Sequence, residues 1–163
     1  MLGVLMAAAA FAITSPAFTN NGNIPPKYTC DAGAQNPSPA LAWKEAPAGT
    51  KSFVLIMHDP DAPLAGGFTH WVLFDIPAST TGLPEAFQPG SIGVSGNSGF
   101  RRAGYGGPCP PSGEHHYHFM LSALDTPSLG LATGATKADV EKAMQGHVLG
   151  TTELVGLYQR QPK

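Results

Sequence analysis

The sequence SFVLIMHD at residues 52–59 is followed by HWVLFDIP at residues 70–77. Both stretches are rich in Val, Ile, Leu, Phe and Trp, and several of these residue types are enriched in β-strands. Strands in which apolar residues run almost without interruption are typical of positions that are covered on both faces. The two stretches therefore predict two central, buried strands at residues 52–58 and 70–76.

Further apolar stretches lie on either side of this pair. They occur at residues 11–13, 92–94, 117–124 and 151–158. Clusters of Gly, Pro, Asn and Asp separate them, and the 20 Gly and 16 Pro of the chain fall mostly in these intervals. Many short strands divided by turn residues favour an antiparallel β-sandwich over alternating β–α–β units.

One segment has the pattern of a helix. Thr136 can cap its N-terminus, and Asp139 adds a negative charge to its first turn. Three apolar residues follow at helical spacing: Val140, Ala143 and Met144. Gly146 ends the pattern. A chain of 163 residues has the size of one domain, so we expect residues 13–163 to form a single, mainly β domain with a short peripheral helix.

The composition argues against two classes of partner. Charged residues make up 12% of the sequence and the formal net charge is -2, so the clustered Lys and Arg that neutralise nucleic-acid phosphates are missing. No apolar run approaches the roughly 20 residues that a bilayer-spanning helix needs. Neither nucleic-acid binding nor stable membrane insertion is expected.

The chain begins with MLGVLMAAAA, a run of small and apolar residues that is typical of a signal peptide. We expect residues 1–12 to be a leader and the mature protein to be periplasmic or secreted. No Lys or Arg precedes the run, so a cytoplasmic protein is the alternative.

Two cysteines, Cys30 and Cys109, lie far apart in the sequence and match no zinc-binding spacing. In an exported protein an even number of cysteines favours a disulfide, which the chain-entropy model values at about 4–5 kcal/mol for so long a loop. Two buried free thiols are the alternative, and the residues alone leave the choice open.

Polar residues gather at the ends of the two central strands. DPDAP at residues 59–63 places Asp59 and Asp61 among rigid prolines, and His70 opens the second strand. Each has an ordinary structural explanation, because turn aspartates bind backbone amides and strand histidines often bind a carbonyl. The functional interpretation is that they line a pocket.

The richest stretch is GYGGPCPPSGEHHYHF at residues 104–119. Its glycines allow close approach of the backbone, and their amides can form an anion-binding nest. In the strand that follows, alternation places His115 and Tyr117 on one face and His116 and His118 on the other. The first face is the more apolar, so we expect His115 and Tyr117 to point inward.

DPDAP, HWVLFDIP and GYGGPCPPSGEHHYHF, in this order and spacing, resemble the phosphatidylethanolamine-binding protein family, and more narrowly its bacterial Raf-kinase-inhibitor-like branch. TSPAF, IPPKYTCD, SPALAW and GHVLGTTELVGLYQR add to the resemblance, which extends over residues 13–160. The resemblance implies a Greek-key β-sandwich with one or two short peripheral helices. It also implies a small pocket for phosphate-like or carboxylate groups.

By position, the resemblance assigns eight residues to this pocket: Asp59, Asp61, Pro63, His70, Gly107, Pro108, His115 and Tyr117. Phe68 stands where animal members often have Trp, and Cys109 stands where Pro is common. Imidazole, phenol and glycine amide groups would donate hydrogen bonds to an anion, while Asp59 would orient an imidazole. Because the set contains no Arg, free phosphate should bind only weakly.

These observations predict a non-enzymatic binding or inhibitor protein without a cofactor. Its ligand would be a phosphate-like group, a phospholipid head group or a phosphorylated partner. A kinase or a protease is the kind of protein partner that the resemblance implies. One alternative is a hydrolase with Ser112 or Cys109 as nucleophile and a His/Asp pair as base, although Ser112 lacks a nucleophile-elbow motif. Another is a metal site formed by Asp59, His70 and His115.

Overall fold

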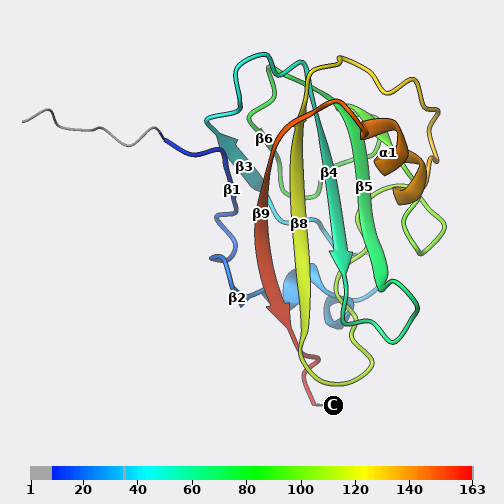
Figure 1. Ribbon diagram of the computed structural model, residues 1–163. Helices are drawn as coiled ribbons and strands as arrows, with labels where there is room; N and C mark the ends of the chain where they lie inside the picture. Colours follow the sequence, from blue (N-terminus) through cyan, green and yellow to red (C-terminus); the bar gives the residue numbers. More distant parts are fainter. Residues whose placement is uncertain (1–8, 35, 163) are drawn as a thin grey trace, which may run out of the picture.

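The structure is a computed structural model that describes residues 9–34 and 36–162 (Figure 1). Its smaller sheet is antiparallel and consists of β1 (Ala12–Thr14), β3 (Leu41–Lys44) and β6 (Gly82–Leu83), in the order β1-β3-β6. The larger sheet has the order β2-β9-β8-β4-β5-β7. Its strands are β2 (Gly22–Asn23), β4 (Ser52–Asp59), β5 (Phe68–Pro77), β7 (Val94–Ser95), β8 (His115–Leu124) and β9 (Val148–Tyr158).

The arrangement of the larger sheet confirms the predicted Greek key. Strands β4, β5 and β7 lie side by side, and the next strand of this sheet, β8, returns to pair with β4 on its other side. This spatial order defines the motif. All pairs in the sheet are antiparallel except that of β2 with β9.

Both faces of the larger sheet are covered, which explains the continuous apolar runs in β4 and β5. Phe53, Leu55 and Met57 of β4 face the core between the two sheets, where Trp43 of β3 also lies. Residues between them in the sequence, such as Val54, belong to a second cluster beneath the helix. The two runs therefore lie in central strands, as their sequences predicted.

The helix α1 (Lys137–Met144) is the predicted one, and it packs against the side of β5 (Figure 1). Thr136 caps it: its hydroxyl accepts a hydrogen bond from the Asp139 amide at 3.2 Å, and the Asp139 carboxylate accepts one from the Thr136 amide at 2.9 Å. Val140 is fully buried against the sheet. The helix ends at Met144, before Gly146.

The predicted strand boundaries differ from the observed ones at several ends. The strand expected at residues 11–13 is β1, one residue later, and the strand expected at residues 92–94 is the shorter β7. β8 and β9 begin two and three residues earlier than expected. The short strands β2, β3 and β6 were not predicted, because two to four residues are too few to show a pattern.

One end of the larger sheet collects segments that are distant in the sequence. β4 ends at Asp59 where β5 begins at Phe68, and β8 begins at His115 on the other side of β4. Two short 3-10 helices, η1 (Pro26–Tyr28) and η2 (Cys30–Ala32), lie at this same lower end in Figure 1. The Greek-key topology thus brings the polar motifs of the sequence together.

Among the described residues, no helix is long and apolar enough to cross a membrane. The expected leader spans residues 1–12, and its first eight residues lie outside the described part of the chain.

Candidate functional site

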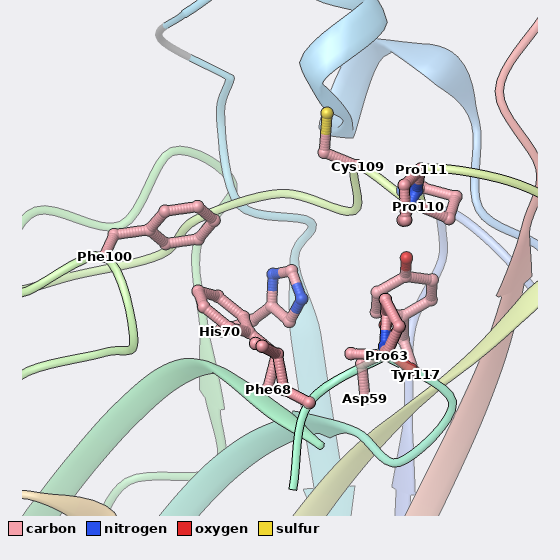
Figure 2. Close-up of a pocket in the computed structure, with 11 residues that line it drawn as sticks. Asp59, Pro63, Phe68, His70, Phe100, Cys109, Pro110, Pro111 and Tyr117 are labelled. Atoms are coloured by element: carbon pink, nitrogen blue, oxygen red, sulfur yellow. The ribbon is translucent and has the colours of Figure 1, made fainter.

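A cavity of about 300 Å³ opens at this end of the larger sheet (Figure 2). It lies between the loop after β4, the start of β5 and the loop before β8. Three of its lining residues carry polar groups, namely Asp59, His70 and Tyr117. The other eight are Ala62, Pro63, Leu64, Phe68, Phe100, Cys109, Pro110 and Pro111. A mostly apolar wall with a few convergent polar groups is typical of small-molecule sites.

Asp59 is the buried acceptor of the site and has a relative exposure of 2%. Its Oδ2 accepts a hydrogen bond from Nδ1 of His115 at 2.7 Å, and its Oδ1 accepts one from the Asp61 amide at 2.8 Å. Asp59 therefore orients an imidazole, and the imidazole is that of His115. His115 itself is buried and is not among the residues that line the cavity.

His70 is held by a different group. Its Nδ1 donates a hydrogen bond to the carbonyl oxygen of Gly106 at 2.7 Å. Burial lowers the pKa of His70 below its ordinary value of 6.5. Since a carbonyl oxygen only accepts, Nδ1 keeps its proton in the neutral ring and Nε2 has none. The ring can therefore donate a hydrogen bond from Nε2 only when it is protonated.

Tyr117 carries a hydroxyl group that can donate a hydrogen bond to a ligand. Its side chain is fully buried, and its Oη has no hydrogen-bond partner within the described residues. Burial, together with the nearby negative charge of Asp59, raises the pKa of Tyr117 well above its ordinary value. The ring lies edge to face with that of His70 at a centroid distance of 5.2 Å, and Figure 2 shows its hydroxyl directed toward Pro110 and Pro111. The neutral phenol thus presents an unused hydrogen-bond donor.

Asp61 does not line the cavity, although the resemblance assigned it to the pocket. Its carboxylate accepts hydrogen bonds from the amide and from Nδ1 of His116, at 2.8 and 2.7 Å. These bonds lower the pKa of Asp61. The pair lies on the outer face of β8, where the alternation of the sequence had placed His116 and where His118 is also found.

Two of the glycine amides expected to bind an anion are hydrogen-bonded within the protein. The Gly106 amide donates to the His70 carbonyl oxygen at 3.0 Å, and the Gly107 amide donates to Oδ1 of Asn36 at 2.8 Å. Gly107 and Pro108 are not among the residues that line the cavity. The amides of Gly106 and Gly107 are therefore not free to take part in the anion nest that the glycines suggested.

The mouth of the cavity contains two apolar residues that the sequence patterns did not indicate. Leu64 and Phe100 line it with relative exposures of 59% and 41%. The Phe100 ring packs against that of Phe68 at 4.8 Å, and Phe68 in turn packs against His70 at 5.0 Å. The single available signal was a large apolar residue inside the polar loop sequence SGNSGFRR.

Neither candidate nucleophile is suitably placed. Cys109 is joined to Cys30 in a disulfide, the first of the two alternatives for these cysteines, so its sulfur is not a free thiolate. Ser112 is exposed and does not line the cavity. Within the described residues, no group of three His, Cys, Asp or Glu side chains could hold a metal ion.

The model of the family described as "Phosphatidylethanolamine-binding protein" matches residues 14–159 of the chain. The chain belongs to this family. This chain is also similar to the UPF0098 protein of Aquifex aeolicus. The two are 48% identical over 157 residues, which cover 93% of this chain and 90% of that protein. The UPF0098 protein of Methanothermobacter thermautotrophicus is 50% identical over 148 residues, with 88% and 95% covered.

Solved structures place the fold in the phosphatidylethanolamine-binding protein family as well. The crystal structure of YbcL from Escherichia coli, described as a new member of the mammalian family, matches with a TM-score of 0.86 at 33% identity. The match covers 94% of this chain and all of that one. CT736 of Chlamydia trachomatis, a putative homologue in the same family, matches with a TM-score of 0.84 at 37% identity, covering 93% and 99% of the two chains.

Proposed function

We propose that this protein is a non-enzymatic binding protein whose cavity holds the anionic group of an amphiphilic ligand, such as a phospholipid head group. The observation that carries the proposal is the unpartnered Tyr117 hydroxyl beside His70 in a cavity that is otherwise apolar. A buried hydroxyl without a partner is unfavourable by about 1–3 kcal/mol. A phosphate oxygen at this place would accept its hydrogen bond and remove that penalty.

The electrostatics of the cavity favour an anion with an apolar remainder over a free anion. Among the residues that the structure describes, no Lys or Arg lines the cavity, so its cationic donor would be His70, and only in the protonated form. Both Asp59 oxygens already accept hydrogen bonds from the protein, so the anion would lie toward Tyr117 and His70 and away from this carboxylate. Contact with the apolar wall would then supply much of the affinity.

The family description supports the same ligand class, because it names a lipid that carries a phosphate in its head group. The disulfide at Cys109 and the position of Ser112 argue against the hydrolase alternative. A kinase or protease partner and a periplasmic location are predictions that come from the resemblance and from the N-terminal sequence.

We predict that hexyl phosphate binds at least about tenfold more tightly than inorganic phosphate, because each buried methylene contributes about 0.8 kcal/mol. Leu64→Ser should weaken the binding of hexyl phosphate by about fivefold and leave that of inorganic phosphate unchanged. Tyr117→Phe should weaken both. Dissociation constants can be measured by NMR titration, following the resonances of His70 and of the aromatic rings that line the cavity.

Leu149→Ser provides a matched control, because Leu149 is also exposed, at 41%, but lies at the opposite end of the larger sheet. It should leave both affinities unchanged. Equal effects of Leu64→Ser and Leu149→Ser, or no binding of either probe by the unmodified protein, would contradict the proposal. Catalytic hydrolysis of hexyl phosphate would contradict its non-enzymatic part.

A further inference from the structure

The disulfide between Cys30 and Cys109 forms part of the cavity, since Cys109 is one of the lining residues. It connects η2 to the loop that precedes β8. We propose that reduction of this disulfide lowers the ligand affinity of the cavity, so that the bond acts as a redox-sensitive control of binding. The inference rests on the proposed function and adds a mode of regulation to it.

The segment of residues 109–114 depends on this bond for its position. Three of its residues, Cys109, Pro110 and Pro111, line the cavity. Among the described residues, none of the segment's side chains forms a hydrogen bond or an ion pair, and the disulfide is its one covalent cross-link. Reduction would therefore remove the one covalent restraint on this wall.

The residues before this segment are held independently of the disulfide. The amide of Gly107 donates to Asn36 at 2.8 Å, and the hydroxyl of Tyr105 donates to the carbonyl oxygen of Tyr28 at 2.7 Å. The carbonyl oxygen of Pro108 accepts a hydrogen bond from the Cys30 amide at 3.0 Å. These bonds should persist after reduction.

The other end of the disulfide, Cys30, lies in η2, and hydrogen bonds hold this 3-10 helix in place as well. The Asp31 carboxylate accepts hydrogen bonds from the Tyr158 hydroxyl, from Nε of Arg160 at 3.2 Å and from the Gln161 amide at 3.2 Å. After the segment, β8 begins at His115, which is bonded to Asp59. The response to reduction should therefore be confined to residues 109–114.

The disulfide is accessible to reagents, because Cys109 is exposed and Cys30 is partly exposed. A dithiol reductant would attack one sulfur as a thiolate and form a mixed disulfide, which its second thiol then resolves. Two electrons and two protons pass to the protein, giving the two free thiols of Cys30 and Cys109. The reductant leaves as its own disulfide, so the exchange is balanced.

A mobile wall would reduce affinity because ligand binding must then order it again. We expect reduced protein to bind hexyl phosphate at least about fivefold more weakly than oxidised protein. If the redox state changes the affinity for the ligand, the ligand must change the redox equilibrium by the same factor. Saturating hexyl phosphate should shift the dithiol–disulfide equilibrium of the protein toward the disulfide by the same factor.

The test measures the affinity for hexyl phosphate before and after treatment with dithiothreitol, and again after reoxidation. The mobility of the backbone is followed in parallel by NMR relaxation. We expect the weaker binding to be reversible and the gain in mobility to be confined to residues 109–114. The Cys30→Ser/Cys109→Ser double variant should have the affinity of the reduced protein and should not respond to dithiothreitol.

Three outcomes would overturn the proposal. The reduced, folded protein could bind hexyl phosphate as tightly as the oxidised form, with no effect of the probe on the redox equilibrium. Reduction could instead unfold the whole molecule, seen as loss of near-ultraviolet circular dichroism, whereas a local control requires the fold to persist. Absence of binding by the oxidised protein would refute the proposed function itself, and the redox control with it.

Discussion

Asp59→Ala is expected to lower the free energy of unfolding by about 3 kcal/mol, whereas Asp61→Ala should lower it by less than about 1 kcal/mol. Each aspartate accepts a hydrogen bond from Nδ1 of a histidine at 2.7 Å, and the two histidines are neighbours in β8. The two pairs differ in burial. The side chains of His115 and Asp59 are 8% and 3% exposed, whereas those of His116 and Asp61 are 50% and 40% exposed.

Burial determines the difference because a solvent-exposed partner regains its hydrogen bonds from water. Removing Asp59 leaves the buried His115 Nδ1 and the part-buried Asp61 amide without their acceptor. Removing Asp61 exposes His116 to water, which replaces the lost bonds. Urea denaturation of the two variants and of the unmodified protein measures both values. Similar losses of stability in the two variants would show that burial does not determine the strength of these pairs.

The central part of the fold could be predicted from the sequence because its signals are local. Continuous apolar runs mark β4 and β5, and the alternation of buried and exposed residues in β8 places His115 and Tyr117 inward and His116 outward. Asp59, His70 and Tyr117 meet because the antiparallel pairing brings the end of one strand to the beginnings of its neighbours. The resemblance and the residue pattern agree on these three.

The remainder of the site depends on contacts that no local pattern encodes. The resemblance assigned Asp61 to the pocket together with Asp59. The hydrogen bond from the Asp61 amide to the Asp59 carboxylate instead makes a turn that sends the Asp61 side chain to the outer face of β8. Phe100 reaches the cavity from a loop more than 20 residues after β5, through ring contacts with Phe68 and His70. The amides of Gly106 and Gly107 are not free to bind an anion, because they donate hydrogen bonds to the His70 carbonyl oxygen and to Asn36.

Anion binding is expected to strengthen as the pH falls, through the titration of His70. In the free protein, burial holds the pKa of His70 below 6.5, so at neutral pH the ring is neutral and its Nε2 has no proton to donate. Protonation adds a charge-assisted donor that contributes about 1.5–3 kcal/mol, equivalent to roughly 10- to 100-fold in affinity. A bound anion favours the protonated ring, so binding raises the pKa of His70.

The direction in which affinity changes with pH follows from this rise in the pKa of His70 on binding. Affinity is highest below the pKa of His70 in the free protein, decreases as the pH rises above that value, and levels off above the pKa of the bound state. Hexyl sulfate is the suitable probe, since its single negative charge does not change between about pH 5 and about pH 8, unlike that of a phosphate monoester, whose second pKa is about 6. Calorimetric or NMR titrations at several pH values measure the profile.

His70→Ala should remove this dependence and bind hexyl sulfate, at low pH, about 10- to 100-fold more weakly than the unmodified protein. His116→Ala is the matched control, because this exposed imidazole is bonded to Asp61 on the outer face of β8 and should leave the profile unchanged. If the dependence on pH persists in His70→Ala, His70 is not the donor that titrates, and the anion does not lie beside it as we propose.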